Sequence, residues 1–227
     1  MSIWTRISEA LAALAKGETL AAVFEKLTTP PERSVAFTIA VIALGAKMAK
    51  ADGTVTRNEV IAFRQVFRIP KEDEAQAARV FNLARQDVAG FEIYARRIAR
   101  MFRDAPEVLE DILEGLFHIS MADGHYHPAE DEFLQQVAQE FGISQSAFAR
   151  IRARHVPNAY ADPYAVLGVE PGTPIEEIRA EWRRQVRETH PDVMMARGVP
   201  EEAIKLATDR LAILNRAWEE ISASENA

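Results

Sequence analysis

Apolar residues recur at intervals of three and four along almost the whole of this 227-residue chain. Those intervals place side chains on one face of an α-helix, whereas a half-buried strand alternates apolar and polar residues. The sequence contains no convincing alternating run. The pattern therefore predicts an all-α protein, with a helical bundle over most of its length and a helical hairpin near its C-terminal end.

Charge and composition exclude several classes of function. The chain has 27 Lys and Arg residues against 34 Asp and Glu residues, and its net charge of −7 disfavours general binding to nucleic acid or anionic membranes. It has no cysteine, which excludes disulfides, thiolate zinc sites and thiol nucleophiles. The N-terminus lacks the pattern of a signal peptide, and the most apolar stretch, Val35 to Ala49, is too short to cross a bilayer. We expect a cytoplasmic protein without a membrane span.

The helical pattern changes near residue 154, and this change divides the chain. Before it, amphipathic helices follow one another with short breaks, as in a bundle, and the clearest are expected at 30–49, 91–102 and 108–120. The stretch around Pro157 interrupts the pattern as a linker would. We therefore expect four segments: N-terminal amphipathic helices at 1–29, a helical bundle at 30–153, a linker at 154–161 and a helical hairpin at 162–223.

A weak internal repeat lies in the bundle. An Asp-Gly turn at Asp52 is followed by Glu59 and a helix, and a similar turn at Asp123 is followed by Glu130 and a helix. An EF-hand is excluded, because the upstream positions of each loop hold no hard oxygen ligand. Two interpretations remain open: the acidic residues cap helices, or the two turns together bind a divalent cation through all four carboxylates.

The C-terminal segment carries the signals of a short helix followed by two longer ones. Asp162 and Gly168 are typical of the start and the end of a short helix. The sequence Thr-Pro-Ile-Glu at 173–176 predicts the start of a second helix that runs to residue 189, and a third helix is expected at 201–221. The apolar stripes of the two longer helices must cover each other, because neither can bury its apolar face alone.

The loop between these two helices begins with His190, Pro191 and Asp192. Pro191 disfavours helical geometry at His190, so the preceding helix should end there, and the proline also stiffens the loop. The preceding helix carries a cationic strip on a chain that is otherwise acidic: Arg179, Arg183, Arg184 and Arg187. A positive strip beside a rigid loop predicts a docking surface for an acidic partner.

These residues together resemble a J-domain over roughly residues 160–223. The resemblance rests on the ordered set of Asp162-Pro163-Tyr164, Leu167-Gly168-Val169, a basic helix and the His190-Pro191-Asp192 tripeptide, and the longer loop is similar to the DjlA-like branch. It implies that His190, Pro191, Asp192 and the four arginines contact a DnaK-type chaperone and promote its ATP hydrolysis. The sequence departs from the family at Gln185, a usual leucine position, and at Val193, a usual lysine position.

Residues 30–150 resemble the TerB-like helical domains that accompany J-domains in DjlA-type proteins. The resemblance rests on the two Asp-Gly turns and their following glutamates. It implies divalent-ion binding at Asp52, Glu59, Asp123 and Glu130, and no other cofactor is expected. Helix capping remains the alternative for these residues.

We therefore expect a co-chaperone that is not itself an enzyme, since the chain has no phosphate-binding glycine loop or nucleophile elbow. The bundle would recruit an unidentified client protein or sense an ion. The alternative is a stress-response or ion-binding module whose J-domain is structural or weakly active. The short linker also raises the hypothesis that the bundle packs on the C-terminal helices and hides the docking strip.

Overall fold

The structure, a computed structural model, describes residues 32–51, 71, 74–75, 78, 82, 90–121, 124–156 and 162–225. The expected N-terminal helices at 1–29 and the first Asp-Gly turn lie outside these residues. Every regular element of the described parts is helical, which confirms the prediction of an all-α protein. The order is α3 (Glu32–Ala51), α6 (Phe91–Met101), α7 (Pro106–Ser120), α8 (Pro128–Phe141), α9 (Gln145–His155), α10 (Pro163–Leu167), α11 (Ile175–Glu188), α12 (Pro191–Arg197), the 3₁₀ helix η2 (Glu201–Ala203) and α13 (Lys205–Glu225).

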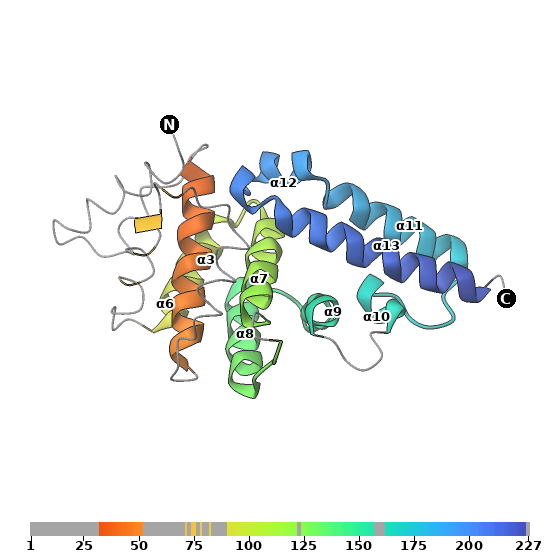
Figure 1. The fold of residues 1–227 in the computed structure, drawn as a ribbon, viewed down its shortest axis with the longest axis horizontal. Coiled ribbons are helices and arrows are strands. Elements are labelled where there is room, and N and C mark those ends of the chain that lie inside the picture. Colours follow the sequence, from red (N-terminus) through yellow and green to blue (C-terminus); the bar gives the residue numbers. More distant parts are fainter. Residues whose placement is uncertain are drawn as a thin grey trace.

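The helices α3, α6, α7, α8 and α9 form the bundle, and α7 lies at its centre (Figure 1). Eleven of the 15 residues of α7 are buried, including two acidic residues, Asp111 and Glu114. Helix α3 is apolar on most faces and packs beside α7 and α6, with Phe37, Ile39 and Leu44 fully buried. Burial of this order is the main source of stability in a bundle of short helices. The two carboxylates of α7 are therefore exceptional, and each needs a partner.

Local signals explain where the bundle helices begin and end. Pro128 occupies the first position of α8, where the missing N–H costs nothing, and the backbone N–H of His127 donates to Oε2 of Glu130 at 2.9 Å. Gly142 ends α8 with a φ of 72°, which glycine adopts without strain. The side chain of Ser144 then caps α9 by accepting a hydrogen bond from the N–H of Ala147.

The helices α10 to α13 form the C-terminal unit, residues 162–225. Asp162 caps α10 by accepting from the N–H of Tyr164 at 3.0 Å, and Gly168 ends it with a φ of 71°, as the sequence predicts. The rings of Trp182 and Trp218 stack with their centroids 5.2 Å apart and join α11 to α13. The unit has a small core of its own, made by Val166, Leu167, Ile178, Leu214, Ala217 and Ile221.

The structure differs from the sequence prediction in four local features. The helix expected at 201–221 is the 3₁₀ helix η2 followed by α13, which begins at Lys205. Pro174, not Thr173, is the N-terminal boundary residue of α11, because the Thr173 hydroxyl donates instead to the carbonyl of Glu170. Helix α9 continues through Arg154 and His155, which the sequence places in the linker. The loop after His190 contains a helix, α12, because proline is well suited to the first helical position.

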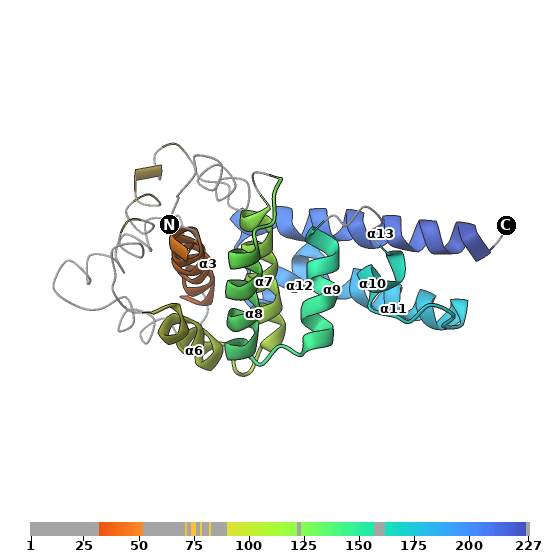
Figure 2. The ribbon, with the colours of Figure 1, turned by 90° about the horizontal axis from the view of Figure 1, so that it is seen from below.

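The two long C-terminal helices do not cover each other over their whole length. The first turns of α13 lie against the bundle, where Leu206 and Ala207 join the same core as α3 and α7. Only the later part of α13 packs along α11 (Figure 1). Seen from below, α9 lies between the α7–α8 pair and the short helix α10 (Figure 2). The C-terminal unit therefore contacts the bundle through the first turns of α13 and through α10, which packs on α9.

Candidate partner-docking site

The tripeptide His190-Pro191-Asp192 forms the first turn of α12. His190 is the N-terminal boundary residue, and its Nδ1 accepts a hydrogen bond from the N–H of Asp192 at 3.2 Å. The carbonyl of His190 accepts from the N–H groups of Val193 and Met194 at 2.9 and 3.0 Å. Pro191 thus both ends α11 and begins α12, and the tripeptide has one defined conformation.

The polar side chains of this tripeptide, the trigger loop, face solvent. The side chain of His190 is 59% exposed and that of Asp192 is 80% exposed, and their Nδ1 and Oδ2 atoms are 3.7 Å apart. The bundle does pack on the C-terminal unit, as the short linker suggests, but it does not cover these two side chains. In this arrangement the trigger loop is therefore open to a partner. The proposal that the bundle hides the cationic strip and so lowers activity stays a hypothesis.

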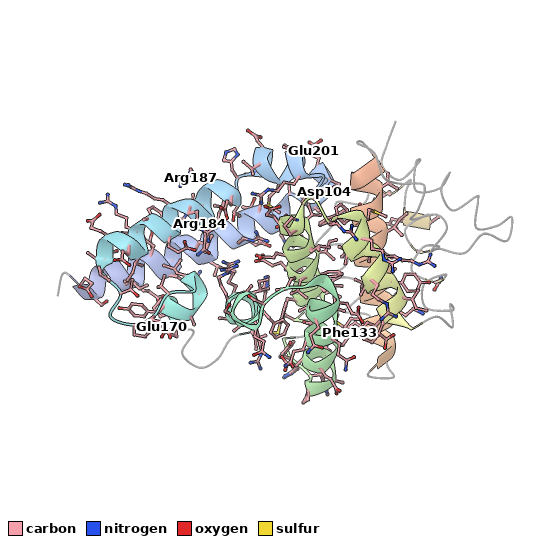
Figure 3. All side chains as sticks on the ribbon, turned by 180° about the vertical axis from the view of Figure 1, so that it is seen from behind. Asp104, Phe133, Glu170, Arg184, Arg187 and Glu201 are labelled. Atoms are coloured by element: carbon pink, nitrogen blue, oxygen red, sulfur yellow. The ribbon has the colours of Figure 1, made fainter. Side chains whose placement is uncertain are left out.

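The four arginines of α11 do not share one environment. Arg183 and Arg187 are exposed and form no ion pair within the described part of the chain. Arg179 is 45% exposed and lies 4.0 Å from the carboxylate of Glu176, at the limit of an ion pair. These three guanidinium groups can all reach a partner. Figure 3 shows Arg187 on the outer side of α11, away from the bundle.

Arg184 differs from the other three arginines. Its Nη1 donates to Glu188 at 2.7 Å and its Nε donates to Glu181 at 2.8 Å. The hydrogen bonds to Glu181 raise the pKa of Arg184 above its ordinary value. Arg184 also lines a cavity of about 200 Å³ between the bundle and the C-terminal unit. Its charge is thus neutralised within the molecule. Arg184 is therefore less available to a partner than the other three arginines of the strip.

A buried network of charges joins the bundle to the C-terminal unit. Glu114 of α7 is at its centre, because its Oε1 accepts from Nη1 of Arg154 at 2.7 Å and its Oε2 accepts from Nε of Arg210 at 2.6 Å. The three side chains are only 4%, 2% and 9% exposed for Arg154, Glu114 and Arg210. Burial alone would raise the pKa of Glu114, but Arg210 and then the other cations hold that pKa well below its usual range. Glu114 therefore remains a carboxylate.

Asp111 lies one turn before Glu114 on α7 and is also buried. Its Oδ1 accepts from Nη2 of Arg210 at 2.8 Å, whereas its Oδ2 has no hydrogen-bond partner among the described residues. Burial raises the pKa of Asp111 to about 6, against the opposing effect of Arg210. The two carboxylates of α7 thus share one guanidinium group, and Asp111 has the less complete set of partners.

Gln185 connects α11 to this network. Its Nε2 donates to the carbonyl of Leu167 at 2.6 Å and to Oε1 of Glu181 at 2.7 Å, and its Oε1 accepts from Nη2 of Arg154. A leucine at this position would satisfy none of these groups. The departure from the J-domain pattern at Gln185 is therefore explained by two polar contacts within the C-terminal unit and one with Arg154 of the bundle.

Sequence reasoning missed Asp111, Glu114, Arg154 and Arg210. The pattern of α7 obscures the network, because Asp111 and Glu114 share one helix face with two further acidic residues, Glu107 and Glu110. Such an acidic face is typical of the solvent-exposed side of an amphipathic helix, so its spacing does not predict that two of the four are buried. Nothing local identifies the cationic partners of Glu114 either, since Arg154 and Arg210 lie 40 and 96 residues further along the chain.

The ion site predicted at the two Asp-Gly turns stays a prediction. Asp52, Glu59 and Asp123 lie outside the described residues. Glu130 is buried and accepts a hydrogen bond from the backbone of His127, which is what the capping interpretation expects of it. Within the described ranges, no group of three or more histidine or acidic side chains is arranged to hold a metal ion.

Comparison with known proteins identifies the bundle. Residues 38–153, just over half of the chain, match the family model described as tellurite resistance protein TerB. The chain belongs to the TerB family. The TerB match ends within α9, so the bundle is the TerB domain and the C-terminal unit follows it.

Similarity to curated proteins extends beyond the TerB domain into the C-terminal unit, and it confirms the resemblance to the DjlA-like branch. Proteins named co-chaperone protein DjlA are similar to this chain in Coxiella burnetii (29% identical, covering 77% of this chain and 72% of the relative), Photobacterium profundum (28%, 84% and 78%) and Legionella pneumophila (27%, 81% and 75%). No solved structure matches the chain. Among the described helices, none is long and apolar enough to span a membrane.

Proposed function

We propose that this protein is a co-chaperone whose C-terminal unit acts as a J-domain and stimulates ATP hydrolysis by a DnaK-type chaperone. The observation that carries the proposal is the exposed trigger loop, with His190 and Asp192 held in a defined helical turn next to the exposed Arg183 and Arg187. The names of the relatives support a role as a co-chaperone.

In this proposal the chain performs no chemistry of its own. Asp192 is an exposed carboxylate that can pair with a cation of the chaperone, while Arg179, Arg183 and Arg187 attract an acidic surface on the same partner. Pro191 limits the entropy lost when the loop binds, because the turn is already formed. ATP is bound and hydrolysed by the partner, which we place in the cytoplasm together with this protein.

We further propose that the TerB domain recruits a client protein. Its match to a family described by tellurite resistance leaves an ion-sensing role at Asp52, Glu59, Asp123 and Glu130 as the second candidate function. Both roles are compatible with the exposed trigger loop, since the bundle and the loop use different surfaces.

The test is single-turnover ATP hydrolysis by a DnaK-type chaperone in the presence of the full chain. Asp192→Asn keeps the size of the side chain but removes its charge, so stimulation should fall to the level of the chaperone alone. Asp104→Asn is the matched control, because Asp104 is an exposed aspartate in the α6–α7 turn and belongs to neither the trigger loop nor the cationic strip (Figure 3). Stimulation by the parent chain that Asp192→Asn leaves intact, or no stimulation at all, would reject the proposal.

A further inference from the structure

Helix α12 begins at the trigger loop and is anchored in the core of the TerB domain. Met194 follows Asp192 by two residues, is fully buried, and is the one buried residue of α12. It belongs to the same core cluster as the apolar residues of α3 and α7. Met194 is therefore buried in a core that it shares with the TerB domain, and α12 packs on α7 as well as on α11 and α13.

The anchor continues along the chain after α12. Val199, Ala203 and Leu206 are buried in the same core as Met194. A Cβ atom added to Gly115 of α7 would lie 3.6 Å from Cδ1 of Leu206 and 3.6 Å from Cγ1 of Val41, so Leu206 and Val41 of α3 both pack close to Gly115. The segment from Met194 to Leu206 thus completes the bundle core.

The residues on either side of Met194 face solvent. Val193 is 36% exposed and Met195 is 40% exposed, so α12 buries a single narrow edge. A helix of seven residues is too short to be stable in water without tertiary contacts. The conformation of the trigger loop, whose turn is closed by the N–H groups of Val193 and Met194, therefore needs tertiary support. Met194 supplies the buried apolar part of that support, and Nη1 of Arg197 adds a hydrogen bond to the carbonyl of Glu188 at 3.4 Å.

We propose that Met194 is a positioning residue through which the TerB domain holds the trigger loop in its exposed, preformed turn. Without the anchor, α12 would open for part of the time, and His190 and Asp192 would be presented to a partner by only a fraction of the molecules. Its consequence for chaperone stimulation rests on the proposed function, whereas the positioning itself can be measured without a partner. Hydrogen exchange and ATPase stimulation accordingly test two separate parts of the inference.

The first measurement is hydrogen exchange of the amides of residues 192–198 in the full-length chain. Met194→Ala should accelerate their exchange by at least about tenfold relative to the rest of the protein, since local opening follows the number of buried contacts. Met194→Leu should restore protection because it keeps the buried volume. Met195→Ala, a change of the same residue type at the exposed neighbour, should have no effect.

Leu206→Ala controls for a simple loss of stability. It removes a buried side chain from the same core but lies beyond η2, so it should weaken the whole protein without selectively opening α12. Equal acceleration at residues 192–198 in Leu206→Ala and Met194→Ala, or unchanged protection in Met194→Ala, would overturn the positioning role.

The second measurement is the dependence of chaperone ATPase stimulation on the concentration of the full chain. A loop that is preformed in only a fraction of molecules weakens apparent affinity by that fraction. Met194→Ala should therefore raise the concentration for half-maximal stimulation by about tenfold and leave the maximum unchanged, whereas Asp192→Asn should lower the maximum. If Met194→Ala accelerates exchange but changes neither quantity, the loop does not need the anchor for function. If the parent chain gives no stimulation, the proposed function fails, and the exchange result still decides the positioning role.

Discussion

Nε of Arg210 donates a hydrogen bond to Oε2 of Glu114 at 2.6 Å, across 96 residues of sequence and between two domains. Both side chains are almost completely buried, and Arg154 completes the group from a third helix. Because the energy of such a network depends strongly on geometry, it fixes the orientation of the C-terminal unit on the TerB domain. The trigger loop consequently has one orientation relative to the surfaces of the TerB domain.

Glu114 should be among the residues that contribute most to stability. Glu114→Gln leaves the buried guanidinium group of Arg154 without a carboxylate and that of Arg210 with Asp111 alone, and we expect it to lower the free energy of unfolding by about 3–5 kcal/mol. Chemical denaturation of the full chain at neutral pH would measure this. Glu110→Gln is the matched control on the same helix, since Glu110 is 37% exposed and pairs with the partly exposed Arg150 at 3.2 Å. Its cost should be below about 1 kcal/mol, and equal costs would contradict the central role of Glu114.

Asp111 should make stability depend on pH in a defined direction. Its pKa is raised from 3.8 to about 6, so its stabilising contribution is complete below pH 3.8 and is lost as the pH rises through about 6. Asp111→Asn cannot ionise and should gain on the parent by up to about 3 kcal/mol between pH 4 and pH 7. The lowered pKa of Glu114 acts in the opposite direction but cancels in the difference between the two proteins. Denaturation curves across this range would refute the assignment if the difference were flat or reversed.

The arginines of α11 should contribute unequally to partner binding. Arg183→Ala and Arg187→Ala each remove an exposed charge, and each should raise the concentration for half-maximal ATPase stimulation several-fold, with a smaller effect at high salt. Arg184→Ala should change that concentration by less than about twofold, because Glu181 and Glu188 already neutralise its charge. A larger effect at Arg184 than at Arg187 would show that the partner displaces these intramolecular pairs.

Gln185→Leu should destabilise the protein, although it restores the residue usual for a J-domain. The substitution leaves Nη2 of Arg154 and the carbonyl of Leu167 without their partner, at a cost of about 1–3 kcal/mol each. Thermal or chemical denaturation of the full chain measures the change. Gln139→Leu on the exposed face of α8 is the control and should stay within about 0.5 kcal/mol. A more stable Gln185→Leu variant would show that apolar burial outweighs the lost polar contacts.

The sequence predicts those parts of the fold that local signals determine. Pro128, Gly142, Asp162 and Gly168 act within one turn of their own positions, so the helices they begin or end are found without knowledge of the tertiary structure. The trigger loop is found for the same reason, since the effect of Pro191 is local.

The sequence does not reveal which distant side chains contact each other in the folded protein. The sequence places Arg154 in a linker and shows Gln185 as a departure from a family pattern, and neither position suggests the other. In the structure, Nη2 of Arg154 donates a hydrogen bond to Oε1 of Gln185. Likewise, the first residues of α13 carry an apolar stripe of the expected period, but the period alone does not say which surface covers it. Leu206 and Ala207 enter the TerB domain rather than pack on α11.

The anchoring of α12 has a consequence for how this chain can be recombined. In the sequence, the boundary between the domains lies before Asp162, so a transplant of residues 162–225 onto another protein would carry every element of the C-terminal unit. In the structure, however, Met194, Val199 and Leu206 are buried in the core of the TerB domain. Transplanted residues 162–225 would therefore expose these apolar side chains and lose the support of the trigger loop. Exchange of the unit between proteins therefore requires a recipient whose central helix offers a matching groove, and the two halves are expected to change together over evolution.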